Sequence, residues 1–217
     1  MIKAVLSDWG HTLFDTAGSP DFVRGWARRH GRAGAVECAE TLYREALTRS
    51  RAPEELAKGR DKSLDVHRRC WLALWSDLEA SLPGISGALY EFETSALGWT
   101  PYVDTRGFLE ALAERRIPLV VVSDVPFDLR PIFAHHGLDH LVHGFLLSGE
   151  HGTVKAEGVL FRRALASVGV APGEAIMVGD NPANDGCAVH EGIRTLLLAP
   201  VPSGAPRGLD AVLALVA

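Results

Sequence analysis

The chain has 217 residues, of which 47% are hydrophobic and 23% are charged, and its formal net charge at pH 7 is −5. A chain of this length and composition can bury one large core, or a core with an inserted module, and the apolar content argues against extensive disorder. Without a basic surplus, the chain lacks the charge with which nucleic-acid-binding proteins contact phosphates.

The predicted elements begin with a short strand, an apolar run at residues 2–6 that lies within an N-terminal segment of residues 1–16. The pattern over residues 17–98 is almost wholly helical, because apolar side chains recur there at helical spacing. The expected helices lie around residues 20–27, 36–47, 62–82 and 89–97. Pro20 suits a helix start, and Pro83 with Gly84 ends the third helix.

From residue 99 to residue 217 the pattern changes to strands that alternate with helices. The expected strands are apolar runs at residues 117–122, 142–147, 175–178 and 194–198. The expected helices are one capped by Asp104 and three that each stop at a glycine, at residues 127–136, 157–168 and 184–191. Uninterrupted apolar strands between helices are typical of a parallel sheet covered on both faces. We therefore predict an α/β fold, with a Rossmann-like core of residues 1–16 and 99–217 and an inserted helical domain of residues 17–98.

The cysteines and the apolar runs indicate the cellular setting. Cys38, Cys70 and Cys187 are far apart and form no CxxC pattern, so neither a zinc site nor a disulfide framework is expected. The N-terminal apolar run is too short for a signal peptide, and no segment approaches the roughly 18 apolar residues of a membrane span. We expect a soluble cytoplasmic protein, a monomer or a homodimer, with no nucleic-acid or membrane partner.

Polar side chains follow several of the apolar runs. Asp8 follows the first run with only Ser7 between them, and Ser123 comes directly after the second. Lys155 lies beyond the third, and Asp180 and Asp185 follow the fourth. Because the carboxyl ends of parallel strands meet at one edge of a sheet, these side chains can converge in one crevice. Each residue taken singly could be a turn, cap or surface residue, but their joint order at strand ends favours a functional site.

The order of these motifs and their residue sequences resemble those of the haloacid dehalogenase-like hydrolase superfamily. Its first motif, D-x-D-G-T-L, is similar to Asp8-Trp9-Gly10-His11-Thr12-Leu13, and its fourth, G-D followed shortly by D, to Gly179, Asp180 and Asp185. Its second motif, a serine or threonine ending a strand, is matched by Ser123, and its third, a lysine before a helix, by Lys155. The likeness covers residues 1–16 and 99–199. In position and helical character, residues 17–98 resemble the cap found between the first two core strands of one subgroup.

The resemblance implies a mechanism and a set of site residues. Asp8 would attack phosphorus and form an aspartyl-phosphate. Mg²⁺ would be held by Asp8, Asp180 and the backbone carbonyl of Gly10, with Asp185 binding the metal directly or orienting its waters. Ser123 and Lys155 would hold the transferring phosphoryl oxygens. The catalytic set is then Asp8, Ser123, Lys155 and His11, and the expected substrate-binding residues are Trp9, His11, Thr12, Ser123, Asp124 and Lys155.

Two positions of the first motif depart from the superfamily pattern. Phosphatases of the superfamily use the second aspartate of D-x-D as general acid and base, but Gly10 stands at that position. General acid–base catalysis is typically worth ~10²–10⁴-fold in rate. The proton could come from His11, which replaces the usual glycine, or the leaving group could need no proton, as in acyl and aryl phosphates. His11 could equally turn away from the substrate.

Three functions from different classes stay open. The favoured one is a Mg²⁺-dependent hydrolase of a small phosphorylated metabolite. The segment Asp8-Trp9-Gly10 also resembles the D-W-A-G-T motif of phosphonoacetaldehyde hydrolases, in which a cap lysine forms a Schiff base; Lys58 and Lys62 are the candidates here. The third is a catalytically impaired relative that binds a phosphoryl ligand or a protein partner. A dehalogenase is disfavoured, because dehalogenases lose the Gly-Asp pair of the fourth motif.

Overall fold

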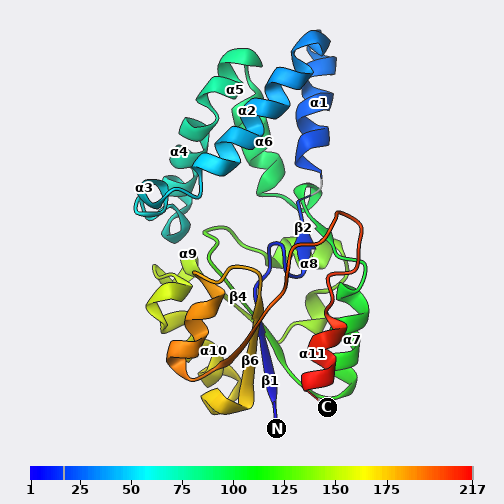
Figure 1. The fold of residues 1–217 in the computed structure, drawn as a ribbon, viewed down its shortest axis with the longest axis vertical. Helices are drawn as coiled ribbons and strands as arrows, with labels where there is room; N and C mark the ends of the chain where they lie inside the picture. The colour runs from blue at the N-terminus through cyan, green and yellow to red at the C-terminus, as the bar shows by residue number, and fades with distance from the viewer. Residues whose placement is uncertain (17, 217) are drawn as a thin grey trace. The chain divides into compact units, whose positions relative to one another are not determined.

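The computed structural model describes residues 1–16 and 18–216. The chain divides into two compact units, one formed by Met1–Asp15 with Pro101–Ala217 and the other by Thr16–Thr100 (Figure 1). Residues 17 and 217, where the predicted inserted domain begins and the predicted core ends, lie outside the described residues. Within the described part of the chain, no helix combines the length and the apolar character needed to cross a membrane.

A parallel sheet of five strands forms the centre of the first unit. Its order is β5-β4-β1-β6-β7, and its strands are β1 (Ala4–Ser7), β4 (Leu119–Ser123), β5 (Gly144–Leu147), β6 (Ala175–Gly179) and β7 (Arg194–Leu197). In the central strand β1, Val5 is opposite Leu119 of β4 and Ile176 of β6. All residues of β1, β4 and β6 are buried, which explains why their sequences are apolar throughout. The predicted α/β fold with a parallel sheet is confirmed.

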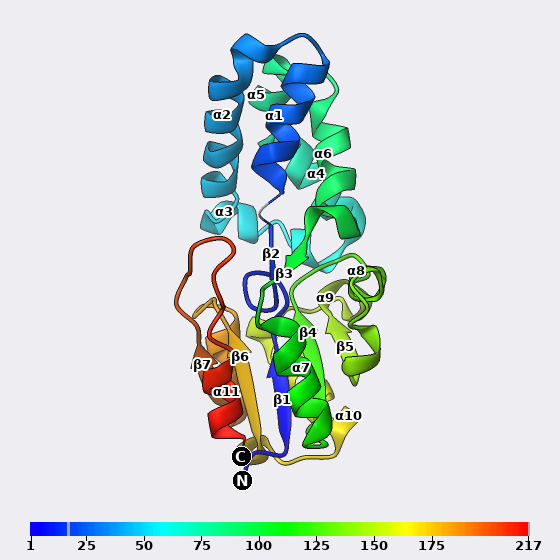
Figure 2. The same cartoon turned by 90° about the vertical axis from the view of Figure 1, so that its right-hand side faces the viewer.

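Helices cover both faces of this sheet. α10 (Val159–Val168) packs on one face, where Leu160 and Phe161 join the core beneath β4 and β6, and α7 (Thr105–Glu114) and α11 (Asp210–Leu215) lie on the other (Figure 2). The shorter helices α8 (Arg130–His135) and α9 (Ser148–His151) follow β4 and β5. α10 ends as predicted at Gly169, whose φ of +66° is a left-handed conformation that favours glycine.

Two predicted helices of the first unit differ from the structure. The helix expected to begin at residue 127 begins at Arg130; the Asp128 carboxylate accepts a hydrogen bond from the Arg130 backbone N–H (3.0 Å), a local contact that favours a turn over helix before that residue. The helix expected at residues 184–191 is the tighter 3₁₀ helix η7 (Asp185–Glu191). Its first residue, Asp185, is tied back to the preceding turn by hydrogen bonds of its side chain.

The second unit is helical. It comprises α1 (Ser19–Arg29), α2 (Val36–Arg49), α3 (Pro53–Leu56), α4 (Leu64–Leu74), α5 (Ser76–Ser81) and α6 (Ile85–Glu93), and short strands β2 (Phe14–Asp15) and β3 (Thr100–Pro101) pair where the chain enters and leaves it. The prediction of one helix over residues 62–82 is wrong, because the helix divides at Trp75 into α4 and α5. At the junction, the Trp75 carbonyl accepts hydrogen bonds from the Glu79 backbone N–H (2.8 Å) and from the Ser86 hydroxyl (3.3 Å).

Candidate active site

Three strands carry predicted site residues to one edge of the sheet. Asp8 directly follows β1, Ser123 is the last residue of β4, and Asp180 directly follows β6. β1 pairs in parallel with both β4 and β6, so these three strand ends point the same way. The sheet therefore brings the predicted side chains to its carboxyl edge, where open α/β sheets bind their ligands.

Lys155 is the hub of this site. Its Nζ donates hydrogen bonds to Oδ1 of Asp8 (2.8 Å) and to Oδ1 of Asp185 (2.5 Å). The Ser123 hydroxyl donates to the same Oδ1 of Asp8 (3.0 Å). Lys155 is only 2% exposed and Asp185 is fully buried, so these contacts form away from bulk water. The structure thus joins residues that are far apart in the chain into one polar cluster.

The electrostatics of the cluster keep Lys155 protonated. Burial alone lowers the pKa of its ammonium group, but the carboxylates of Asp8 and Asp185 outweigh this effect, so the pKa lies above its ordinary value. Burial raises the pKa of Asp180, and the neighbouring carboxylate of Asp185 raises it further. Three carboxylates, those of Asp8, Asp180 and Asp185, thus gather around the single ammonium of Lys155.

Asp185 fixes the turn that carries Asp180. Its Oδ2 accepts hydrogen bonds from the backbone N–H groups of Asp180 and Asn181, both at 2.9 Å. The carboxylate lies so close to Gly179 that an added Cβ there would be 2.1 Å from Oδ2. Only glycine fits at residue 179, which gives the Gly-Asp pair of the fourth motif a steric reason.

The donor set of the cluster suits a divalent cation. Asp8, Asp180 and Asp185 each offer a carboxylate oxygen, and these oxygens all lie within 4.8 Å of one another. Hard oxygen ligands that carry excess negative charge are the preferred environment of Mg²⁺, the cofactor expected from the sequence. These residues therefore fit a magnesium ion.

His11 has an unusual backbone. Its φ is +55°, in the left-handed region that residues other than glycine rarely adopt, at a cost of roughly 1–2 kcal/mol. Its N–H donates to the carbonyl of Phe14 (2.6 Å). The His11 side chain is 48% exposed, and its Nδ1 lies 3.9 Å from Oδ1 of Asp15. The loop thus holds an accessible imidazole one residue after Gly10.

The other predicted substrate-binding residues have different surroundings. Asp124 accepts a hydrogen bond from the backbone N–H of Lys155 (2.7 Å) and so holds the main chain of that lysine. Trp9 is 3% exposed, and its ring meets that of Phe127 edge-on at 5.9 Å between centroids. Thr12 is fully buried. Trp9 and Thr12 are therefore packed into the first unit and do not present their side chains to open solvent.

Sequence reasoning missed Arg207, which contacts the first-motif loop from the C-terminal segment. Its Nε donates to the carbonyl of His11 (2.6 Å) although the two residues are 196 positions apart. Arg207 stands in no apolar periodicity and in no recognisable motif, and its partner in the loop is a backbone atom. The sequence therefore offered no signal for this contact.

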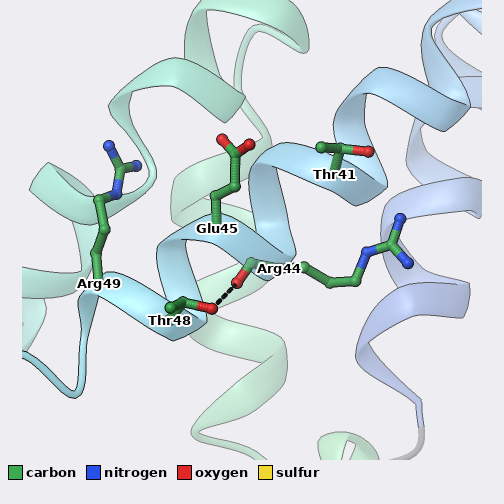
Figure 3. A pocket seen from close by; sticks show the side chains of 5 residues that line it. All are labelled: Thr41, Arg44, Glu45, Thr48 and Arg49. Atoms are coloured by element: carbon green, nitrogen blue, oxygen red, sulfur yellow. Dashed lines mark hydrogen bonds between the residues drawn. The ribbon is translucent and has the colours of Figure 1, made fainter.

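A hollow on the second unit contains none of the predicted site residues. It runs along the exposed side of α2 and is lined by Thr41, Arg44, Glu45, Thr48 and Arg49 (Figure 3). The Thr48 hydroxyl donates to the Arg44 carbonyl (3.1 Å), a local contact within the helix. Its lining is an ordinary solvated helix face, in contrast to the buried cluster around Lys155.

Comparison with known proteins places this geometry in a family. The model of the haloacid dehalogenase-like hydrolase family matches residues 2–187. A phosphoserine phosphatase of Thermus thermophilus is 41% identical over 85 residues, which are 39% of this chain and 34% of that protein. A glyceraldehyde 3-phosphate phosphatase of Methanopyrus kandleri is 28% identical over 184 residues, which are 83% of this chain and 76% of that protein. The chain thus spans about a third of the first relative and about three quarters of the second.

The fold is also shared with solved structures. The L-2-haloacid dehalogenase of Xanthobacter autotrophicus superposes with a TM-score of 0.71 at 21% identity, over 98% of this chain and 88% of that one. At this identity the likeness concerns the fold, whereas the family match extends over most of the chain and includes all four motifs up to Asp185. The resemblance inferred from the motifs is therefore confirmed, and the chain belongs to the haloacid dehalogenase-like hydrolase family.

Proposed function

We propose that this protein is a Mg²⁺-dependent phosphatase that hydrolyses a small phosphorylated metabolite through an aspartyl-phosphate on Asp8. The observation that carries the proposal is the buried set of Asp8, Ser123 and Lys155, with Asp180 and Asp185 beside it. Two relatives are named as phosphatases of phosphoserine and of glyceraldehyde 3-phosphate, which supports a phosphomonoester as the substrate.

The two oxygens of Asp8 have different surroundings. Oδ1 accepts hydrogen bonds from both Ser123 and Lys155, while Oδ2 accepts none within the described part of the chain. Oδ2 is therefore the oxygen that attacks phosphorus. A P–O bond forms to Oδ2, the P–O bond to the leaving group breaks, and its electron pair departs with the leaving oxygen. Water then attacks phosphorus, the P–Oδ2 bond breaks with its electron pair returning to the Asp8 carboxylate, and the proton of the water leaves with the released phosphate.

The remaining cluster residues hold and balance charge. The ammonium of Lys155 and the hydroxyl of Ser123 bind the phosphoryl oxygens during the transfer. Lys155 is protonated, since its pKa lies above the ordinary value. Asp8, Asp180 and the Gly10 carbonyl would hold Mg²⁺, which when bound supplies a countercharge for the phosphate. Asp185 already accepts three hydrogen bonds, from Lys155 and from two backbone N–H groups, so we assign it to orienting Lys155 and the Asp180 turn.

The leaving group is the part of the reaction that Gly10 changes. An alkoxide needs a proton as it departs, and Gly10 has no side chain to supply one. The accessible imidazole of His11, one residue away, is the candidate donor. An acyl or aryl phosphate would need no donor. Replacement of His11 by Asn should therefore lower the rate on an alkyl phosphate and leave the rate on p-nitrophenyl phosphate almost unchanged.

The phosphonate alternative requires a desolvated lysine of low pKa in the helical unit. Lys58 does not meet this requirement, because it is exposed and its Nζ is 2.6 Å from Oε1 of Glu55, a contact that raises its pKa. Lys62 lies in the short 3₁₀ helix Arg60–Lys62 and is half-buried. An adduct trapped on either lysine by borohydride, with phosphonoacetaldehyde as substrate, would restore this alternative.

The test of the proposed function is phosphate release by the purified protein with and without Mg²⁺. The substrates are a panel of phosphomonoesters, an aryl phosphate and an acyl phosphate. We expect Mg²⁺-dependent release that Asp8→Asn abolishes. Asp128→Asn is the control, because Asp128 is an exposed aspartate in the loop after β4 and should keep full activity. Release that survives Asp8→Asn would refute the mechanism, and a panel without any turnover would favour the ligand-binding alternative.

A further inference from the structure

Arg207 is a buried cation that the proposed mechanism does not use. It is 3% exposed and lies between β7 and α11. Among the described residues, no carboxylate forms an ion pair with it, and its guanidinium donates to backbone carbonyls instead. Burying a charge is costly unless hydrogen bonds satisfy it fully, so such a placement indicates a specific task.

The partners of Arg207 belong to both halves of the candidate active site. Nε donates to the carbonyl of His11 (2.6 Å), next to Gly10 in the first-motif loop. Nη2 donates to the carbonyl of Leu198 (3.0 Å), and Nη1 donates to the carbonyl of Ala199. The backbone N–H of Leu198 in turn donates to the carbonyl of Gly179 (2.8 Å). One side chain thus connects the loop beside Gly10 with the end of β6.

Arg207 is itself held in place. The Asp104 carboxylate accepts hydrogen bonds from the backbone N–H groups of Arg207 (2.8 Å), Gly208 (2.8 Å) and Leu209 (3.0 Å). The ring of Tyr102 lies below the guanidinium, with 5.7 Å from Cζ to the ring centroid. These contacts fix the backbone of the C-terminal segment, so the position of the guanidinium relative to His11 is also fixed.

We propose that Arg207 is a positioning residue, which sets the spacing between the loop of Gly10 and His11 and the turn of Asp180. Its effect on catalysis rests on the proposed function, whereas its ordering of the loop does not. The left-handed backbone of His11 is costly and persists only where its surroundings determine it. The guanidinium meets this need with donors in a planar fork, which a lysine ammonium cannot reproduce.

The test compares Arg207→Lys with Arg115→Lys. Arg115 is an exposed arginine at the C-terminal end of α7, and its Nη1 donates to the Leu213 carbonyl (2.8 Å), so it also ties the C-terminal segment by a backbone contact. The measurements are hydrogen exchange of peptides covering residues 9–14 and 176–186, Mg²⁺ affinity by calorimetry, and kcat and KM. For Arg207→Lys we expect faster exchange confined to these two segments and a Mg²⁺ affinity lower by about 10–100-fold. We also expect kcat to fall by about 10²-fold with a much smaller change in KM, whereas Arg115→Lys should match the wild type.

Two results would overturn the proposal. One is an Arg207→Lys protein that matches Arg115→Lys in all three measurements, and the other is an exchange rate raised evenly over the whole first unit, which indicates general stabilisation only. If Arg207→Lys does not fold, Asp104→Asn replaces it as the test, because this variant keeps the arginine but weakens the hydrogen bonds that hold the backbone of residues 207–209. The proposal then requires faster exchange in the same two segments. If the wild type hydrolyses no phosphate, the proposed function fails, while exchange and Mg²⁺ binding still decide the role of Arg207.

Discussion

Removing the Lys155 ammonium tests the cluster most directly. Lys155→Met keeps a long side chain but leaves the carboxylates of Asp8 and Asp185 buried without their shared cation. Breaking a buried ion pair by removing one partner typically costs about 3–5 kcal/mol. One kcal/mol corresponds to about 2–4 °C in proteins of this size, so the melting temperature should fall by about 6–20 °C.

The assay is thermal unfolding followed by circular dichroism, with Lys3→Met as the control. Lys3 also pairs with a carboxylate, at 2.6 Å from Glu174, but its side chain is 57% exposed, so water screens the pair and its loss should change the melting temperature little. Mg²⁺ should raise the melting temperature of Lys155→Met more than that of the wild type, because the ion supplies the missing positive charge. A Lys155→Met protein that melts together with Lys3→Met would show that the cluster is not the buried ion network described above.

Three further outcomes are expected. Gly10→Asp restores a carboxyl group at the general-acid position and should raise the rate on alkyl phosphates, by up to about 10²-fold in kcat; an unchanged rate would contradict this. Gly179→Ala places a Cβ 2.1 Å from the Asp185 carboxylate and should lower the free energy of unfolding, measured in urea, by about 1–3 kcal/mol. Gly173→Ala is the control, because its added Cβ meets open space and should leave that free energy unchanged. Burial lowers the pKa of His67 to about 4, so its neutral form stabilises the fold above its unfolded pKa of about 6.5, and this contribution is lost as the pH falls towards 4. The free energy of unfolding should therefore drop by about 2 kcal/mol between pH 7.5 and pH 5, and His67→Gln should remove that part of the pH dependence.

Much of the first unit could be predicted because its signals are local. The strands β1, β4 and β6 are buried on both faces, so their runs of apolar residues are visible in the sequence without any knowledge of their neighbours. Gly169 ends α10 through its own left-handed conformation. The positions of Asp8, Ser123 and Asp180 follow from strand ends, and a parallel sheet turns that order into proximity.

Several of the differences concern residues whose partners lie further along the chain, whereas the side-chain hydrogen bonds of Asp128 and Asp185 at the two altered helices are local. Asp104 was expected to cap α7, but its carboxylate instead accepts backbone N–H groups more than a hundred residues away. Trp75 sits in an unbroken helical pattern, yet its helix divides there, where the hydroxyl of Ser86 from the next helix also donates to its carbonyl. Arg207 belongs to the same class. Periodicity and capping rules describe a segment and its immediate neighbours, so contacts of this kind lie beyond them.

The pairing of Leu13 with Tyr102 has an evolutionary consequence. The backbone N–H of Tyr102 and the hydroxyl of Thr105 both donate to the Leu13 carbonyl, at 3.1 Å and 2.7 Å, so the polypeptide departs from the first unit and rejoins it at adjacent points. A module joined at two neighbouring points can be lengthened, exchanged or deleted with little disturbance to its host. Descendants of one ancestral hydrolase could therefore diversify residues 16–100 freely while inheriting the ammonium–carboxylate machinery intact.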